Sequence, residues 1–327
     1  MKISRGVFII LFLFLEHNSQ MFNPAALYAQ TVKNEGHHQV VLALKNGFSE
    51  DGAVTPEWIE ALRCLRHQPG ISAGQFGQKT LSAEETAWAN LIKTKMPVWA
   101  AMTDSLAIPF RAITPPGTVT ILLGNPGGED AFVYKDSTIC FDLNRLHHEY
   151  GDALTAINID RIDRFFAHEF THVLHKAWRK QHPVELESPF DDALWDCLTE
   201  GLGNYRSLSD KWVTENGTLT DHARVVLSRL QPVFVQRISA LRHAGDEEAA
   251  KLMEGLSMGP FEQKWGALTV ALWLAQEAQG DDANLQKWVE AGPEGILTLA
   301  QKYLPGELKG TIRNTAERGN TPAAGFD

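Results

Sequence analysis

The amino-acid sequence predicts a mostly helical α+β fold with a small antiparallel sheet placed directly before one central helix. Three observations lead to this prediction. Apolar residues recur at helical spacing along most of residues 30–115 and again along 206–327. Between them, residues 117–143 change to the shorter period of strands. The helical period then returns in a run that contains the sequence His-Glu-Phe-Thr-His at 168–172.

Composition and charge limit the class of protein. The chain has 327 residues, of which 44% are hydrophobic and 21% charged, so it can bury a sizeable core as one large domain or two small ones. Its formal net charge is −10 at pH 7. An acidic surface repels nucleic-acid phosphates and anionic lipids, and we therefore expect neither as a partner.

Residues 1–29 have the features of a signal peptide. Lys2 and Arg5 precede the apolar run 6–15, which is too short to span a bilayer. Small residues follow as far as Ala29, after which we place the cleavage point; a retained N-terminal anchor is the alternative. No later stretch approaches the length of about 20 apolar residues that a membrane helix needs. We therefore expect an exported protein, periplasmic or extracellular, with no stable membrane span after signal removal.

Residues 30–115 are predicted to form an N-terminal helical region. Thr55-Pro56 suits the N-cap and the first position of a helix. Ser82 and Glu85 have the spacing of a capping box for a second helix, and Pro97 should kink or end that helix. The aromatic residues of these helices indicate core packing, and we expect no chemistry from this region.

Residues 116–206 are predicted to form the catalytic core. Segments 118–123, 131–134 and 138–143 have the pattern of strands in an antiparallel meander. The helix that contains the two histidines should follow, beginning near Asn158 or Asp160, because either side chain can cap it.

A second helix of this core is predicted at 189–205. Ser188 can cap it, and Pro189 suits its first position. Gly201 and Gly203 fall within one turn of this helix, and each costs roughly 1 kcal/mol relative to alanine. A close approach of a neighbouring helix around Glu200 would offset that cost, because glycine lets another backbone come near.

Residues 207–327 are predicted to form a C-terminal helical subdomain, with helical stretches at 219–241, 261–276 and 293–303 before a polar tail. The three cysteines of the chain lie far apart in sequence and include no Cys-x-x-Cys pair. An odd number leaves at least one unpaired, and we interpret all three as small buried hydrophobic residues: Cys64, Cys140 and Cys197.

The spacing His-Glu-x-x-His predicts a metal centre. On a helix, His168 and His172 lie one turn apart on the same face, so both imidazoles can bind one ion. Glu169 lies beside them and is the natural general base for a water activated by that ion. Hydrolysis by zinc needs three protein ligands and one open position, and we predict Glu200 on the second helix as the third ligand.

His-Glu-Phe-Thr-His, followed after 27 residues by Glu-Gly-Leu-Gly-Asn-Tyr, resembles the gluzincin zinc metallopeptidases, and most of all the bacterial predicted zinc-dependent proteases. The resemblance implies a zincin-like fold and a Zn²⁺ cofactor. It implies His168, His172 and Glu200 as zinc ligands and Glu169 as the base. It further implies that an edge strand of the sheet holds extended peptide. It covers residues 117–205 well and 260–304 loosely, and the segment beginning at Lys264 lacks the tyrosine that many members carry.

Two other residues compete for the place of third ligand. His175 lies one turn beyond His172, but three ligands along one straight helix cannot surround a tetrahedral ion well. Asp196 lies one turn before Glu200 and would require a rotated helix. The metzincin class is excluded because it needs glycine and histidine at positions 175 and 178, where this chain has His175 and Trp178.

Further residues are candidates for supporting roles. Asn204 could accept a hydrogen bond from a ligand imidazole, at the place where thermolysin-like relatives have an aspartate. Tyr205 is our prediction for the catalytic residue that stabilises the oxyanion, because it is nearest in sequence. His222, His243 and Tyr303 are more distant candidates for the same role.

These observations predict a zinc-dependent metallopeptidase that acts on peptide or protein substrates. Two other functions stay open: a catalytically inactive zincin-fold binding or structural protein, and a zinc hydrolase that acts on a non-peptide amide or ester. Glu169 argues against the inactive protein, because a structural zinc site has no use for a general base. A closed site with Asp196 or Cys197 as a fourth ligand would favour it.

Overall fold

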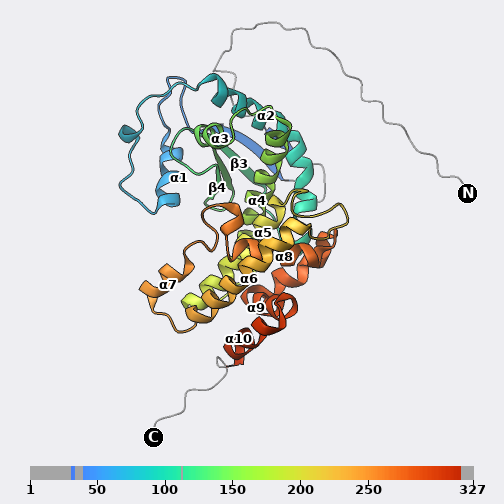
Figure 1. The fold of residues 1–327 in the computed structure, drawn as a ribbon. Coiled ribbons are helices and arrows are strands. Elements are labelled where there is room, and N and C mark those ends of the chain that lie inside the picture. The colour runs from blue at the N-terminus through green and yellow to red at the C-terminus, as the bar shows by residue number, and fades with distance from the viewer. Residues whose placement is uncertain (1–30, 34–39, 112, 318–327) are drawn as a thin grey trace, which may run out of the picture.

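The computed structural model describes residues 31–33, 40–111 and 113–317. The sheet lies at one end of the molecule and the C-terminal helices at the other, with helices α4 (Ala156–Gln181) and α5 (Pro189–Ser207) between them (Figure 1). The predicted signal peptide lies outside the described residues. Within the described ranges, no helix combines the length and the hydropathy needed to cross a membrane.

The sheet has five strands and is mixed. Their spatial order is β1 (Thr31–Lys33), β2 (Val41–Asn46), β3 (Thr118–Gly124), β5 (Thr138–Asp142) and β4 (Ala131–Tyr134). β2, β3 and β5 are parallel to one another, and the two edge strands β1 and β4 pair with their neighbours in the antiparallel sense.

The predicted antiparallel meander is correct for one strand pair and wrong for the other. β4 and β5 are antiparallel as expected, but β3 pairs with β5 in the parallel sense. Every residue of β5 is buried, whereas β4 alternates between buried and half-buried positions. A strand that is apolar on both faces suits the interior of a sheet, so β5 lies between β3 and the edge strand β4.

The N-terminal region is not only helical, because 30–115 also contains β1 and β2. Its predicted helices are present as α1 (Pro56–Arg66) and α2 (Ala83–Leu106). Both predicted N-terminal caps are confirmed: the hydroxyl of Thr55 accepts a hydrogen bond from the N–H of Trp58, and Ser82 with Glu85 forms the capping box. α2 does not end at Pro97. This proline is exposed, so its ring lies on the solvent side of α2 while the opposite side of the helix packs in the core.

Helix α4 begins earlier than predicted. Its N-cap is Thr155, whose hydroxyl accepts a hydrogen bond of 3.2 Å from the N–H of Asn158. The side chain of Asn158 instead donates to the carbonyls of Tyr150 and Asp152, at 2.9 and 2.7 Å. These bonds hold the turn between α3 (Leu143–Tyr150) and α4, and therefore the direction in which α4 enters the core.

The predicted start of α5 is confirmed: the hydroxyl of Ser188 accepts from the N–H of Asp191, and Pro189 occupies the first turn. Helical structure after residue 206 is also confirmed. The remaining elements are the 3₁₀ turns η2 (Ala73–Gln75), η3 (Ile108–Phe110), η4 (Phe261–Gln263) and η5 (Asp282–Leu285), and the helices α6 (Asp221–Leu241), α7 (Asp246–Met253), α8 (Ala267–Ala278), α9 (Gln286–Tyr303) and α10 (Gly306–Glu317).

One contiguous hydrophobic core runs from β2 through α2, α4 and α5 into the C-terminal helices. Large aromatic rings fill its centre; Trp99, for example, stacks on Phe166 of α4 with ring centroids 4.6 Å apart. A smaller cluster packs α1 against the other face of the sheet. The division of the chain at residues 116 and 206 stays a prediction.

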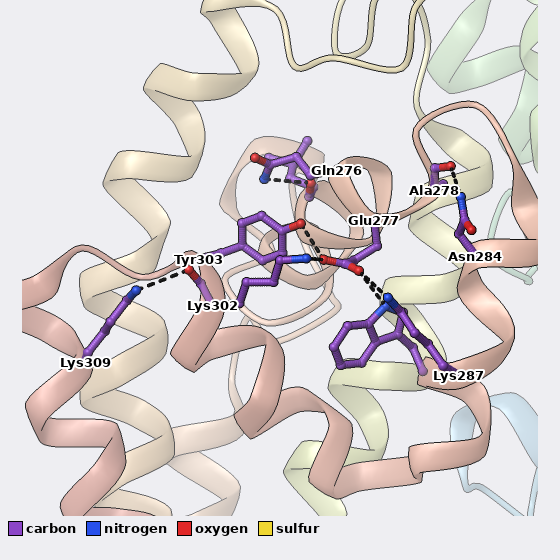
Figure 2. Close-up of polar contacts among 10 residues, drawn as sticks. Gln276, Glu277, Ala278, Asn284, Lys287, Lys302, Tyr303 and Lys309 are labelled. Atoms are coloured by element: carbon purple, nitrogen blue, oxygen red, sulfur yellow. Dashed lines mark hydrogen bonds and ion pairs between the residues drawn. The ribbon is translucent and has the colours of Figure 1, made fainter.

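A buried carboxylate joins α8 to α9 (Figure 2). Glu277 of α8 accepts hydrogen bonds from the hydroxyl of Tyr303, at 2.5 Å, and the indole of Trp288, at 3.2 Å. It also forms ion pairs with Lys302 and, at 2.8 Å, with Lys287. Burial by itself would raise the pKa of Glu277, but the hydrogen bonds from Lys287, Lys302 and Tyr303 outweigh burial and lower it to about 2. The cluster therefore stabilises the packing of two C-terminal helices.

Candidate metal centre

The two histidines of the His-Glu-x-x-His sequence face each other on one side of α4. Their Nε2 atoms are 2.9 Å apart, and their rings meet edge to face with centroids 4.6 Å apart. Both side chains are largely shielded from solvent, with 14% of His168 and 11% of His172 exposed. The pair follows from the spacing of four residues on one helix, which places both side chains on the same face, and it requires no contact with another part of the chain.

Glu200 of α5 completes the group. Its carboxylate oxygens lie 3.8 Å from Nε2 of His168 and 3.6 Å from Nε2 of His172. The three candidate ligand atoms all lie within 4.8 Å of one another. The structure thus brings together the three residues that the sequence predicts as metal ligands, from two different helices.

The geometry of this group fits a tetrahedral zinc ion. Bonds of about 2.0–2.1 Å at tetrahedral angles separate ligand atoms by about 3.3–3.4 Å. The two nitrogens are 2.9 Å apart, and each lies 3.6 or 3.8 Å from a different oxygen of the Glu200 carboxylate, so small side-chain shifts would bring one oxygen and both nitrogens to these separations. Two imidazoles and one carboxylate are also a donor set of catalytic zinc sites, in which the fourth position is left to water or substrate.

The two glycines of α5 permit the close approach that the sequence predicts. A Cβ placed on Gly203 would lie 2.8 Å from Nε2 of His168 and 3.0 Å from Cε1 of His172. A Cβ on Gly201 would lie 2.5 Å from Cγ1 of Val270 on α8. Gly203 therefore makes room for the two imidazoles, and Gly201 makes room for α8.

The electrostatics of the site favour the neutral imidazoles that bind metal ions. Burial lowers the pKa of His168 well below its ordinary value, and the neighbouring His172 lowers it further. Burial also lowers the pKa of His172, against the opposing effect of the Glu200 carboxylate. Both rings therefore present an unprotonated nitrogen at neutral pH.

Glu169 is the buried acid beside this group, with 7% of the residue exposed. Burial raises the pKa of Glu169 well above its ordinary value, and the carboxylate of Glu200 adds to the effect. A carboxylate with a raised pKa takes a proton more readily than an ordinary one. The general-base role of Glu169 stays a prediction, and the direction of its pKa shift is compatible with that role.

Ser207, which the sequence reasoning missed, contacts one of the imidazoles. Its hydroxyl lies 3.1 Å from Nδ1 of His168, the nitrogen that points away from the ligand group. Asn204 does not make the contact predicted for it: Nδ1 of His168 is next to Ser207, Nδ1 of His172 has no hydrogen-bond partner among the described residues, and the Asn204 amide donates at 2.9 Å to the main-chain carbonyl of Glu200. Ser207 is the last residue of α5, one helical turn after Gly203, so its spacing on the helix was the available signal.

The structure does not bring the predicted oxyanion donors to the group. The hydroxyl of Tyr205 donates to Asp282 at 2.8 Å, and the same carboxylate forms an ion pair with Arg206. Burial, and then Asp282, raise the pKa of Tyr205. Tyr303 donates to Glu277, His222 lies 3.1 Å from Glu262, and His243 lies in the turn after α6. Tyr205 is thus held in a structural contact, and its predicted catalytic role gains no support from its position.

The competing ligands also lie outside the group. His175 is buried and stacks on Trp195 with ring centroids 4.6 Å apart, and burial lowers its pKa to about 3, so it is a neutral core side chain. Burial raises the pKa of Asp196 to about 6, with the Glu200 carboxylate adding to it. All three cysteines are free thiols; Cys140 and Cys197 are buried as expected, whereas Cys64 is exposed, which corrects the prediction for that residue.

A surface hollow of about 660 Å³ between α1 and the β4–β5 turn is lined in part by Cys64, but by neither Glu169 nor the three candidate metal ligands. Comparisons with protein-family models, with curated proteins and with solved structures find no match for this chain.

Proposed function

We propose that this protein is a zinc-dependent metallopeptidase with a zincin-like catalytic core. In this proposal His168, His172 and Glu200 bind Zn²⁺, and Glu169 is the general base. One observation supports it above the others: two imidazoles from α4 and one carboxylate from α5 converge to within 4.8 Å, with a buried glutamate next to them. The proposal includes export of the protein and a peptide or protein substrate.

A zinc ion held by these three ligands supplies a Lewis acid that polarises the substrate carbonyl and makes water more acidic. Glu169 then accepts a proton as the water oxygen adds to the carbonyl carbon, and the carbonyl electron pair moves to oxygen. When the carbon–nitrogen bond breaks, Glu169 returns that proton to the leaving amine. The pKa of Glu169, raised by burial and by Glu200, suits both transfers.

The test compares the wild type with two substitutions. Glu169→Gln keeps the shape of the side chain and removes the base, so peptide hydrolysis should be lost while the zinc content stays at one ion per chain. Glu200→Ala removes a ligand and should lose the zinc. Zinc is measured by mass spectrometry of the purified protein, and hydrolysis with a peptide library with and without a chelator.

Each alternative has a distinct outcome in this experiment. Full peptidase activity of Glu169→Gln would refute the assigned mechanism, and unchanged zinc in Glu200→Ala would move the third ligand elsewhere. Zinc binding without hydrolysis of any peptide, ester or amide would favour an inactive zincin-fold protein. Chelator-sensitive cleavage of esters or small amides, with the peptide library intact, would favour a hydrolase of non-peptide substrates.

A further inference from the structure

We propose that Arg161 of α4 binds the C-terminal carboxylate of the substrate peptide. This inference rests on the proposed peptidase function and names the class of peptide that the enzyme would prefer. Three observations carry it. Arg161 lies on the same face of α4 as the two histidines, its guanidinium is held by anchored neighbours, and its charge has no acidic partner among the described residues.

Arg161 and the two histidines share one face of α4. Residues three or four positions apart on a helix are neighbours on the same face, and a stripe at this spacing is formed by Arg161, Phe165, His168 and His172. His168 follows Arg161 by seven positions, which corresponds to about 10.5 Å along the helix axis. Arg161 therefore lies where this face leads away from the metal centre toward the start of α4.

The ring of Tyr150 joins Arg161 to the rest of this stripe. Its centre lies 5.6 Å from the ring centre of Phe165 and 4.3 Å from the guanidinium carbon of Arg161. The Tyr150 hydroxyl donates to Asp130 at 2.6 Å, and this bond anchors the ring. A second anchor is the buried Asn158, which accepts from one guanidinium nitrogen and donates to two main-chain carbonyls. A guanidinium fixed in this way can bind a carboxylate through two parallel hydrogen bonds.

The positive charge of Arg161 is not neutralised by an ion pair with any residue that the structure describes. The acids nearest to it are engaged elsewhere. Asp160 of the same helix pairs with Arg164. Asp130 accepts from the Tyr150 hydroxyl on one oxygen and from a main-chain N–H on the other. Arg161 is half-buried, and its remaining guanidinium nitrogens are not among the buried unpaired atoms, so a ligand can reach them from solvent.

The edge strand β4 runs alongside the part of α4 that contains the metal centre. Just before β4, Asp130 bonds to Tyr150. Just after it, the carbonyl of Lys135 accepts from the ammonium of Lys176 at 3.0 Å. The two histidines lie on α4 between these two contacts. An extended peptide that pairs with the outer edge of β4 would therefore pass the metal centre, and its end near the start of β4 would approach Arg161.

The spacing suits a short C-terminal fragment of the substrate. An extended chain advances about 3.3 Å per residue, and a guanidinium–carboxylate hydrogen bond spans about 2.8 Å. A separation of about 10.5 Å along α4 thus leaves room for about two residues after the scissile bond. The α-carboxylate is the anion that every unmodified peptide carries at that end. We therefore expect the enzyme to release fragments of about two residues from the C-terminus of its substrates.

The test compares two peptides of one sequence, one ending in a free carboxylate and the other in an amide. The wild type should cleave the free acid with a kcat/KM about 10–100-fold higher, the factor expected for a charge-assisted hydrogen bond. Arg161→Gln should lose this preference by slowing only the free acid. Arg161→Lys, which keeps the charge but not the paired donors, should show an intermediate ratio. Arg224→Gln removes an exposed arginine of α6 and is the matched control, with the wild-type ratio.

The ratio compares two substrates of one protein, so a loss of stability in Arg161→Gln cannot imitate the expected result. Binding is measured without turnover on zinc-loaded Glu169→Gln. Calorimetry should show the same preference for the free acid, and addition of Arg161→Gln should abolish it. A third peptide, amidated and with glutamate as its last residue, should bind as weakly as the plain amide. Binding as tight as that of the free acid would assign Arg161 to a side-chain carboxylate and overturn the assignment to the chain terminus.

Failure of this inference and failure of the proposed function have different signatures. Equal kcat/KM for acid and amide in an active wild type, or an unchanged ratio in Arg161→Gln, would refute the role of Arg161 and leave the peptidase function standing. If the wild type shows no zinc-dependent hydrolysis of any peptide, the proposed function itself is refuted.

Discussion

Gly201 and Gly203 of α5 offer the sharpest test of how this site is built. The two residues are separated by one position, and replacement of either by alanine adds the same methyl group to the same helix. At Gly203 the methyl would meet the imidazoles of His168 and His172, whereas at Gly201 it would meet Val270 of α8. The same chemical change should therefore affect metal binding at one position and fold stability at the other.

For Gly201→Ala, the gain in helix propensity is about 1 kcal/mol and overpacking costs up to about 3 kcal/mol, so we expect a net loss near 2 kcal/mol in the free energy of unfolding. The upper cost applies because the added methyl would meet both Cγ1 and Cβ of Val270, at 2.5 and 2.8 Å. The Cβ atom cannot rotate away, so α8 itself must shift.

For Gly203→Ala, the obstructing atoms belong to imidazoles that can rotate when no metal holds them. The metal-free protein should therefore keep its stability or gain up to about 1 kcal/mol from helix propensity. Zinc affinity should fall by at least about 10–100-fold, because the methyl would displace the Nε2 atom that binds the ion. This loss corresponds to about 1.4–2.8 kcal/mol of binding free energy.

The assay is urea unfolding of wild type and both variants, with and without zinc, together with zinc titration against a chromophoric chelator. Zinc should stabilise the wild type and Gly201→Ala by similar amounts and Gly203→Ala by less, since the stabilisation follows the affinity. Wild-type zinc affinity in Gly203→Ala, or lost zinc affinity in a folded Gly201→Ala, would refute the reasoning that separates the two glycines.

Two further outcomes are expected. Glu277→Gln should lower the free energy of unfolding at pH 7 by about 2 kcal/mol. The drop of the Glu277 pKa from 4.5 to about 2 corresponds to at most about 3.4 kcal/mol. We expect less than this maximum, because the two lysines paired with Glu277 are half exposed and solvent weakens their interaction with it. Because the pKa of Glu277 is lower in the folded protein than in the unfolded chain, its ionised carboxylate stabilises the fold above about pH 4.5, and this stabilisation is lost as the pH falls towards 2. The difference in free energy of unfolding between wild type and Glu277→Gln, measured by urea unfolding, should therefore shrink over that range. A difference that stays constant with pH would contradict this account. Ser207→Ala removes the hydrogen bond to Nδ1 of His168 and should weaken zinc binding about tenfold in the chelator titration. Its free energy of unfolding should change by less than about 1 kcal/mol. An unchanged zinc affinity would show that Ser207 does not orient the imidazole of His168.

Local features of this protein could be predicted from the sequence because their causes are local. The caps at Thr55, Ser82 and Ser188 depend on side chains that accept a hydrogen bond from the backbone N–H three residues later. His168 and His172 face each other because residues four apart share one face of a helix. Two glycines within one helical turn, which helix propensity disfavours, also indicated correctly that a neighbouring element comes close to α5.

The order of the strands could not be predicted in the same way. A strand pattern identifies which residues are extended, but the partner of each strand is chosen by burial on both faces of the finished sheet. β5 follows β4 by a short turn and pairs with it as expected, yet the other edge of β5 is occupied by β3 in the parallel sense. The full burial of β5 marks it as an inner strand, but that burial belongs to the folded sheet, and in the sequence the strand has polar residues at both ends, Thr138 and Asp142.

The sequence by itself determined the chemical set of the candidate site: two imidazoles one turn apart, a glutamate beside them and a second glutamate on a capped helix. Only the tertiary structure decided which groups surround that set. Packing of α5 on α4 placed Ser207 beside His168, packing of α8 on α5 placed Val270 beside Gly201, and Tyr205 was directed to Asp282. These contacts join residues between 39 and 77 positions apart along the chain, and no local periodicity encodes a distance of that length.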